Sequence, residues 1–481
     1  MKFSTKPQPA NASACALAWA GARAETSKGT EWHGGKLAAM PINSGAYPMK
    51  LFYDNEIVTL KDKENGFILY SPLIHKRLRV NKAVFLIVED VLKNNGEINL
   101  PAVKGTISKE FGVTPSNEDI LSQIEDLKKL NILFDDEKGK NNLIGAVNAK
   151  IVKDIQQSDF STAYLHLTMR CNFSCAYCYN RAWEKDFSKE LNTAEWVEVA
   201  NKLSKTAIKQ INVTGGEALV RKDCGVILKK LSELKFKVTL LTNGSLLHAK
   251  YEEVLPYVNS IVLSLDSENE YTNELNRSAV GFNKIFQVIK RITDEFPEKL
   301  VVRSVITANN INEVDAFHKR LKTDYGIRHT IKTMFLPNRM EEIAQVPNLE
   351  KMKTLNNTEI GESDIYYRCS AGKKIIALSP SGDIFPCQSL MYPDLKMGNI
   401  LNSNWQEEVK TSATTLMPRL LGEKSGCTDC QLRHFCGGGC PAISYRLHGD
   451  LTRKLDFLCP HLKEQAKCRL ENVQSTWETI N

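Results

Sequence analysis

The chain has 481 residues, of which 42% are hydrophobic and 25% are charged. This length accommodates roughly three domains of about 100–200 residues each, so packed cores are available. The formal net charge of +7 suits an acidic partner without identifying one. No apolar run approaches the roughly 18 residues that a membrane-spanning helix needs, so we expect a soluble protein with no membrane partner.

Residues 1–48 are rich in alanine, glycine and serine and show no hydrophobic periodicity. Lys2 and Lys6 precede the stretch ACALAWAGARA, which imitates a short secretory signal, but Arg23 stands at the would-be cleavage site. We therefore predict an extension that is disordered or not translated, with Met49 as the natural start. We expect a cytoplasmic protein, because the cysteine chemistry described below needs a reducing compartment.

Residues 49–145 form the first predicted domain. Two strands, 50–60 and 67–71, are separated by the turn KDKENG. Amphipathic helical patterns follow at 81–96, 102–112 and 116–131. The first pattern ends at the C-cap signal Gly96, and the third begins with a serine or asparagine cap. A hairpin with three helices is typical of a small winged-helix-like unit, and the polar run FDDEKGKNN marks a linker after it.

Residues 155–345 alternate between strand-like apolar runs and amphipathic helices, which favours βα units around a parallel sheet. The strand candidates are AYLHLTM, QINVTG, KVTLLTN, SIVLSLD, VVRSVIT and HTIKTMFL. Six units are too few for a complete eight-stranded barrel. The fold class is therefore α/β, with a partial (β/α)6 TIM-like barrel whose working face lies at the carboxyl ends of the strands.

Thirteen cysteines, an odd number in a long chain, favour metal or redox chemistry over a disulfide framework. Cys171, Cys175 and Cys178 have the spacing C-x3-C-x2-C, directly after the first predicted strand. A structural zinc site has four protein ligands, whereas an iron–sulfur cube held by three thiolates leaves one iron open to a substrate or cofactor. A zinc ion with a bound water, or three buried thiols, is the alternative.

The second strand is followed by TGGEAL, residues 214–219. Gly215 and Gly216 would let backbone groups approach a ligand closely, and Glu217 supplies a carboxylate able to hold an ammonium group. Such a triplet alone usually marks a turn. Beside the three-cysteine motif on the neighbouring strand, it indicates a cofactor pocket.

Over residues 160–340 the sequence resembles the radical S-adenosylmethionine (SAM) superfamily. The resemblance rests on the cysteine motif, with the aromatic Tyr177 before its last cysteine, and on the GGE triplet of the next strand. Ala218 replaces the proline that usually follows that triplet, which implies less rigidity and no lost ligand.

The resemblance implies that the open iron of a [4Fe-4S] cluster chelates the amino and carboxylate groups of SAM. An electron from the reduced cluster then cleaves the sulfonium to a 5′-deoxyadenosyl radical. It also implies that Tyr177 lies along the adenine, with Gly216 and Glu217 at the methionine amine. Ser264 and Arg277 would lie at the ribose and carboxylate, although a strand-end hydroxyl and a surface cation would explain them equally well.

Residues 365–470 contain the other spaced cysteines, Cys369, Cys387, Cys427, Cys430, Cys436, Cys440 and Cys459. In this order they resemble the SPASM domain of radical SAM peptide maturases, which holds two auxiliary [4Fe-4S] clusters; a zinc ribbon is the alternative. By resemblance, Cys427, Cys430, Cys436 and Cys459 hold one cluster, and Cys369, Cys387 and Cys440 hold the other. Between Cys436 and Cys440, Gly437 to Gly439 would let backbone N–H groups point at sulfur.

The second auxiliary cluster is one ligand short. Either Cys468 completes it or its fourth iron is open, although Cys468 is also readily explained as a buried thiol. Sulfatase-activating relatives have a catalytic aspartate after the cysteine of the corresponding segment, whereas this chain has Gln388. An amide cannot accept a proton at neutral pH, which argues against formylglycine formation.

The sequence therefore predicts an enzyme that modifies a ribosomally made precursor peptide, forming a thioether crosslink. It would contain three [4Fe-4S] clusters and SAM, with flavodoxin or ferredoxin as electron donor. Carbon–carbon crosslinking or epimerisation is the alternative, with Cys224 as a possible hydrogen donor in the latter.

The N-terminal unit resembles peptide-recognition domains that add a leader peptide as a strand. Because its third helix is not strongly basic, we expect no nucleic-acid partner; a zinc-binding winged-helix regulator is the alternative from another class.

Overall fold

The computed structural model describes residues 49–55, 57–61, 67–72, 76–146, 159–180, 189–277, 282–348, 351–352, 369–421, 425–428, 430 and 432–472. The predicted extension over residues 1–48 lies outside this set. The chain forms two compact units. The first comprises residues 1–73 and 77–144, and the second comprises residues 74–76 and 145–481. Each unit is described by itself.

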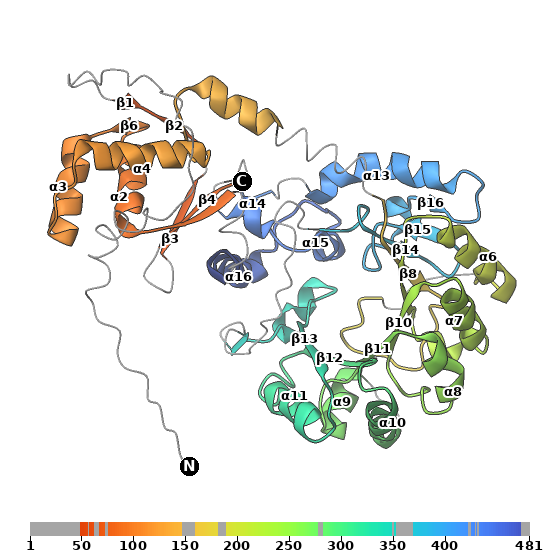
Figure 1. The fold of residues 1–481 in the computed structure, drawn as a ribbon. Helices are drawn as coiled ribbons and strands as arrows, with labels where there is room; N and C mark the ends of the chain where they lie inside the picture. Colours follow the sequence, from red (N-terminus) through yellow and green to blue (C-terminus); the bar gives the residue numbers. More distant parts are fainter. Residues whose placement is uncertain are drawn as a thin grey trace, which may run out of the picture. The chain divides into compact units, whose positions relative to one another are not determined.

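The first unit combines short strands with helices (Figure 1). Two strand pairs, β1 (Met49–Lys50) with β6 (Glu97–Ile98) and β2 (Phe52–Tyr53) with β7 (Leu133–Phe134), are antiparallel. A three-stranded sheet has the order β3 (Val58–Lys61), β4 (Phe67–Ser71) and β5 (Lys76–Val80). The labelled helices are α2 (Lys82–Lys93), α3 (Leu100–Phe111) and α4 (Asn117–Lys129). Residues 137–144 are helical as well, so the prediction of a linker over FDDEKGKNN was wrong.

The prediction of one continuous strand over 50–60 was wrong, because the chain turns at Asp54 and Asn55. The Ile57 N–H donates to the Asp54 carbonyl (3.0 Å), and the Ser71 hydroxyl donates to the Asp54 carboxylate (2.6 Å). Aspartate and asparagine favour such turns because their side chains bond nearby groups. The segment therefore supplies β1, β2 and β3 to three different pairings.

The three helices confirm the predicted helical patterns. Ser116 caps α4 in a reciprocal capping box with Asp119, as the sequence indicated. Gly96 lies two residues beyond the C-cap Asn94, where its positive φ of +95° lets its N–H donate to the Val91 carbonyl (2.8 Å).

All six predicted strands of the second unit are present, and they run parallel in sequence order. They are β8 (Thr162–His166), β9 (Gln210–Thr214), β10 (Lys237–Thr242), β11 (Ser260–Ser264), β12 (Leu300–Ile306) and β13 (His329–Met334). This arrangement confirms an α/β fold with a partial barrel.

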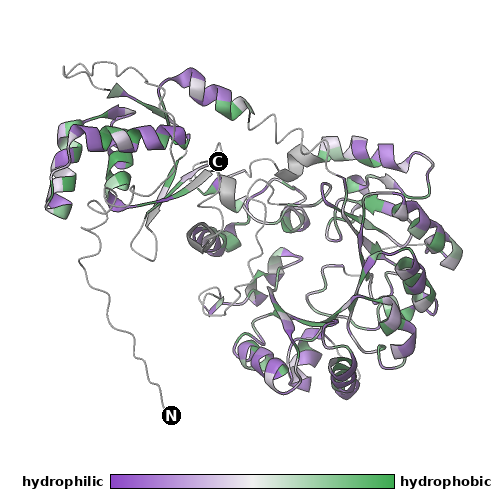
Figure 2. Ribbon diagram, in the orientation of Figure 1, coloured by the Kyte–Doolittle hydropathy of each residue, from purple (hydrophilic) through white to green (hydrophobic). Residues whose placement is uncertain are grey.

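Helices flank the curved sheet (Figure 1). They are α6 (Thr193–Ser204), α7 (Cys224–Glu233), α8 (Tyr251–Val254), α9 (Glu270–Arg277), α10 (Phe282–Glu295) and α11 (Val314–Thr323). Hydrophobic and hydrophilic residues alternate along them (Figure 2). On α10, for example, Ile285, Val288, Ile289 and Ile292 recur at helical spacing and are buried. No helix in the described ranges is long and apolar enough to span a membrane.

The C-terminal strands extend the barrel sheet. β14 (Ile375–Leu378) pairs in parallel with β8, and β15 (Asp383–Phe385) and β16 (Gly398–Asn399) continue the sheet antiparallel, giving nine strands. The sequence did not indicate this pairing, since it suggested a separate cysteine-rich module. Ile376 and Leu378 are buried in the same core as β8 and β9.

The remaining helices lie in the C-terminal part of this unit. They are α13 (Trp405–Leu421), α14 (Arg433–Cys436), α15 (Pro441–His448) and α16 (Cys459–Asn472). The Lys202 ammonium of α6 donates to the carbonyls of Ile400 and Leu401, both at 3.0 Å. These bonds fasten a barrel helix to the segment that follows β16.

We expect stability to fall in acid because of His318, which is buried on α11 with its Nε2 2.8 Å from the Ser304 hydroxyl. Burial, reinforced by Lys332, lowers the pKa of His318 to about 4. Between about pH 6.5 and 4 the unfolded chain binds a proton that the folded chain does not, so folding loses roughly 3 kcal/mol as the pH falls. In denaturant titrations His318→Gln should flatten this pH slope. The exposed control His329→Gln should keep it, and equal slopes in both variants would contradict the assignment.

Candidate functional site

A cavity of ≈ 380 Å³ lies at the carboxyl ends of the barrel strands. All of the residues that the sequence assigned to the SAM site line it, namely Cys171, Cys175, Tyr177, Cys178, Gly215, Gly216, Glu217, Ser264 and Arg277. They come from the loops after β8 and β9, from the end of β11 and from the end of α9. The structure thus brings together residues that are up to about a hundred positions apart.

Backbone hydrogen bonds join the start of the cysteine loop to the glycine motif. The Gly216 N–H donates to the Thr168 carbonyl (2.8 Å), and the Glu217 N–H donates to the Arg170 carbonyl (2.9 Å). A Cβ on Gly215 would lie 2.2 Å from the Thr168 oxygen, and one on Gly216 would lie 2.4 Å from the Arg170 oxygen. The close approach that these glycines allow is therefore to the chain's own backbone, whereas the sequence had suggested a ligand.

The cysteine loop is also anchored to the end of α9. The Ala176 N–H donates to the Asn276 carbonyl (3.0 Å), and the Cys175 thiol donates to the Arg277 carbonyl (3.7 Å). Burial raises the pKa of the Cys171 thiol and raises that of Cys175 to about 11. At neutral pH these thiols hold their protons, so a metal that binds them as thiolates must release protons.

Glu217 is 2% exposed and its carboxylate is held by three donors. Leu219 N–H (3.1 Å) and the Thr242 hydroxyl (2.9 Å) donate to Oε1, and Asn243 N–H (2.7 Å) donates to Oε2. Burial raises its pKa, and these hydrogen bonds oppose the rise. Since a carboxylate has about four acceptor positions, one remains for a ligand ammonium group.

Tyr177, Asp266 and Arg277 form a buried polar network. The Tyr177 hydroxyl donates to Asp266 Oδ2 (2.5 Å) and accepts from Arg277 Nη1 (2.9 Å). Arg277 Nη1 lies 3.7 Å from Asp266 Oδ1, which also accepts the Val305 N–H (2.8 Å). Burial raises the pKa of Asp266, and Arg277 opposes the rise. Asp266 therefore fixes two of the predicted cofactor-binding side chains and neutralises one of them.

Sequence reasoning missed Asp266, Thr242 and Asn243. Thr242 ends β10, Asn243 follows it, and Asp266 lies two residues after β11. The ends of the strands are where polar side chains reach the working face of such a sheet. Their position at the strand ends could have identified them from the sequence, since the strand patterns LSLD and LLTN contain these three residues.

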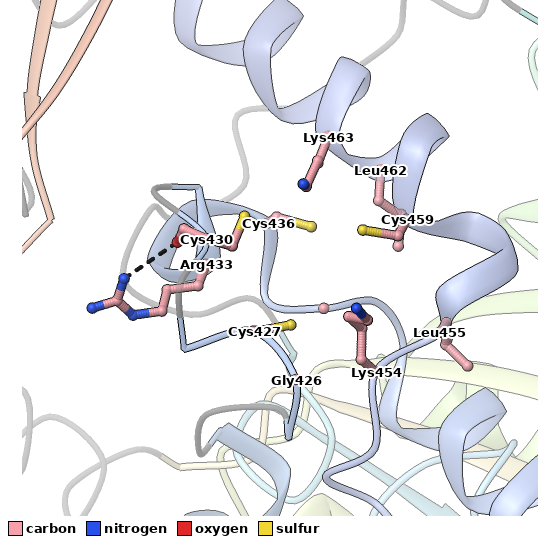
Figure 3. A pocket seen from close by; sticks show the side chains of 11 residues that line it. Gly426, Cys427, Cys430, Arg433, Cys436, Lys454, Leu455, Cys459, Leu462 and Lys463 are labelled. Atoms are coloured by element: carbon pink, nitrogen blue, oxygen red, sulfur yellow. Dashed lines mark hydrogen bonds between the residues drawn. The ribbon is translucent and has the colours of Figure 1, made fainter.

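A second group of cysteines lines a smaller pocket of ≈ 50 Å³. It contains Cys427, Cys430, Cys436 and Cys459, the set predicted to hold one auxiliary cluster. Figure 3 shows Cys427, Cys436 and Cys459 directing their sulfur atoms toward a shared space. The positively charged residues Arg433, Lys454 and Lys463 lie around the same pocket. Gly437, Gly438 and Gly439 all have positive φ, which allows the tight turn after Cys436.

The third group of cysteines, Cys369, Cys387 and Cys440, also lies close together in the structure. Cys387 is buried in an apolar cluster against which Cys369 packs. Cys369 and Cys440 both interact electrostatically with the Cys387 thiol, whose pKa burial raises to about 12. Cys440 also lines the large cavity, together with Gln388. One cysteine of this group therefore faces the same space as Cys171, Cys175 and Cys178.

The other cysteines have different surroundings. Cys224 begins α7 and is fully buried in the barrel core, and it does not line the large cavity. Cys468 belongs to α16, but its side chain lies outside the described residues. Within the described ranges no three His, Cys, Asp or Glu side chains form a group that could hold a single metal ion.

Residues 165–321 match the radical SAM superfamily. This part of the chain is a radical SAM domain. Curated relatives cover a longer stretch. The mycofactocin maturase MftC of Mycolicibacterium smegmatis is 22% identical over 306 residues, which are 58% of this chain and 77% of MftC. The antilisterial bacteriocin subtilosin biosynthesis protein AlbA of Bacillus subtilis is 26% identical over 300 residues, 57% of this chain and 66% of AlbA.

Solved structures share the fold. Streptococcus suis SuiB bound to S-adenosylmethionine matches with a TM-score of 0.53 at 17% identity, covering 84% of this chain and 99% of SuiB. SuiB bound to its precursor peptide SuiA matches with a TM-score of 0.51 at 16% identity, covering 84% and 98%.

A radical SAM domain implies one [4Fe-4S] cluster and SAM. The donor set of this domain fits them, because three thiol side chains face one cavity and the buried Glu217 keeps an acceptor position free. Each iron of a cube binds a different cysteine, so the sulfur atoms need not converge on one point as they would around a single ion.

Gly216→Ala should destabilise the radical SAM domain by about 2 kcal/mol or more, because the new methyl group meets backbone oxygens that cannot rotate away. Gly105→Ala on α3 is the control, since nothing lies within 4 Å of its Cβ. Thermal unfolding and iron content after reconstitution measure the effect. An unchanged midpoint and full iron content in Gly216→Ala would contradict the backbone contact.

Proposed function

We propose that the chain is a cytoplasmic radical SAM/SPASM enzyme that forms a thioether crosslink in a ribosomally made precursor peptide. The observation that carries the proposal is the shared cavity, in which Cys171, Cys175 and Cys178 face Cys440 and Gln388. A peptide in that cavity would lie within reach of both cysteine groups.

The similar proteins support a peptide substrate. MftC is a maturase, AlbA takes part in bacteriocin biosynthesis, and SuiB was solved with a precursor peptide.

In the proposed SAM site, Cys171, Cys175 and Cys178 would hold a [4Fe-4S] cluster, which would supply the electron for reductive cleavage of SAM. Glu217 accepts the methionine ammonium at its remaining position, next to Gly215 and Gly216. Arg277, held by Asp266 and Tyr177, binds the methionine carboxylate. Tyr177 and Ser264 border the adenosine.

In the SPASM part, Cys427, Cys430, Cys436 and Cys459 would hold one auxiliary cluster. Cys369, Cys387 and Cys440 would hold the other cluster, which would supply an electron acceptor and, unless Cys468 is its fourth ligand, a binding position for a substrate thiol as thiolate. Thioether formation needs both, since closing the carbon–sulfur bond releases the thiol proton and one electron. Gln388 cannot accept that proton.

The N-terminal unit, predicted as winged-helix-like over residues 49–145, is proposed to bind the leader of the precursor by strand addition. Strand β3 lies at one edge of the three-stranded sheet, and within the described residues no strand pairs with its outer side. Flavodoxin or ferredoxin is the proposed electron donor.

The combined Cys171→Ala, Cys175→Ala and Cys178→Ala variant tests the SAM site. It should form no 5′-deoxyadenosine while keeping about eight irons per chain, four for each auxiliary cluster. Iron analysis after anaerobic reconstitution and chromatography of the reaction provide the measurement. Retained SAM cleavage would refute the assignment, and zinc in place of iron would favour the regulatory alternative.

Analysis of the wild-type product distinguishes the proposed reactions. A cysteine that no longer reacts with an alkylating reagent indicates a thioether, whereas a carbon–carbon crosslink leaves the thiol reactive, and epimerisation leaves the mass unchanged.

Deleting residues 50–140 tests the leader site. We expect weaker binding of a full-length precursor taken from a small cysteine-rich reading frame next to the gene, because the β3 edge is lost. SAM cleavage without peptide should persist, since the deletion spares the radical SAM domain. Fluorescence titration measures the affinity, and an unchanged dissociation constant would count against leader recognition by this unit.

A further inference from the structure

Three side chains that line the large cavity have buried polar atoms without a partner. Within the described parts of the chain, Arg303 Nε, Arg446 Nε and Gln388 Oε1 make no hydrogen bond. Burying such atoms unpaired is costly, so a native site normally satisfies them with protein, water or ligand. All three residues line the cavity, while the unpaired atoms themselves are shielded from it, so an occupant would reach them as the side chains turn.

The charges of the cavity are also unbalanced. Three arginines line it, and only Arg277 has an acid nearby, since Asp266 lies 3.7 Å from its Nη1. Among the described residues no carboxylate lies within 4.0 Å of Arg303 or Arg446. Glu217 is the one carboxylate among the described lining residues, and three donors already occupy it. Within the part of the chain that the structure describes, two guanidinium groups therefore lack a counter-charge.

The two arginines border the proposed SAM site but start from other elements than Arg277. Arg303 starts from β12, beside Ser264, and its charge opposes the burial that raises the pKa of Tyr164 and of Tyr179. It therefore extends toward the β8 side of the barrel, where Tyr164 also interacts with Cys387.

Arg446 lies on α15, on the C-terminal side of the cavity. Its Nη1 donates to Asn338 Oδ1 (2.5 Å), and Asn338 Nδ2 donates to the Cys178 carbonyl (3.4 Å). Gln388 directly follows Cys387. Gln388, Cys440 and Arg446 all come from the C-terminal segment and line the same cavity.

We infer that Arg303, Arg446 and Gln388 form a subsite for an acidic peptide segment, in which the arginines bind an aspartate or glutamate side chain near the modified residue. Guanidinium groups bind carboxylates through paired, charge-assisted hydrogen bonds. Gln388 Oε1 accepts a backbone N–H of the same segment. This inference rests on the proposed function, because it names the substrate chemistry of the same cavity.

A carboxylate could also come from SAM, so the experiment separates the two sources. The reconstituted full-length holoenzyme is titrated with acetyl-Gly-Cys-Gly-Glu-Gly-amide and with the matched glutamine peptide, whose ends carry no charge. The wild type should bind the glutamate peptide roughly ten-fold more tightly, as expected for a buried charge-assisted pair. Arg303→Gln and Arg446→Gln should lose this preference, and Arg303→Lys and Arg446→Lys should keep part of it.

The control measurements distinguish a loss of peptide binding from damage to the SAM site or to the fold. The exposed Arg320→Gln variant, whose arginine pairs with Glu268 and Asp324 on the surface, should behave as wild type. SAM affinity by equilibrium dialysis, iron content and peptide-free 5′-deoxyadenosine formation should be unchanged in the Arg303 and Arg446 variants. Equal wild-type affinity for the two peptides would overturn the inference and leave the proposed function standing. Loss of SAM affinity in the variants would also overturn it, by assigning the carboxylate to SAM. A wild-type holoenzyme that forms no 5′-deoxyadenosine would remove the proposed function and this inference together.

Discussion

The site depends on the backbone contact between the cysteine loop and the segment after β9. Two hydrogen bonds, from Gly216 to Thr168 and from Glu217 to Arg170, continue the pairing of β8 and β9 beyond the ends of both strands. No side chain fits between these backbones at Gly215 or Gly216. The three cysteines and the buried glutamate are thus positioned by the sheet itself, which places them more rigidly than a free loop would.

Three cysteine groups lie in three different electrostatic environments. The first is near the paired charges of Asp266 and Arg277. The second is surrounded by Arg433, Lys454 and Lys463, although Lys454 is also paired with Asp456 at 2.9 Å. The third is packed among apolar side chains. Because nearby cations favour the more negative, reduced state of a cluster and apolar burial disfavours it, the proposed clusters would differ in potential. An enzyme that both gives and receives electrons needs such a difference.

The sequence allowed the parallel barrel to be predicted strand by strand, because each strand is a buried apolar run followed by a helical pattern. The cysteine motif and the GGE triplet were expected to lie together because motifs at strand ends meet on one face of such a sheet, and they do line one cavity. Tyr177, Ser264 and Arg277, which the family resemblance implied, line the same cavity. The prediction missed the pairing of β14 with β8, because β8 lies about two hundred residues earlier and the sequence around β14 carries no local signal of such a partner. Arg303 and Arg446 were missed for a related reason. A single arginine in a strand or helix pattern normally points to solvent, and only the tertiary structure turns these two inward.

The pairing of β8 with β14 has a consequence for synthesis. Ser161, beside β8, bonds to Lys374, and 213 positions separate the two. At about 5–20 residues per second the ribosome needs roughly 10–40 s to deliver the second strand after the first. During that time β8 can pair with β9 but exposes its other edge, and an exposed strand edge is a template for pairing with other chains. The growing chain is therefore at its most aggregation-prone after the cysteine loop has been made and before the C-terminal strands cover it.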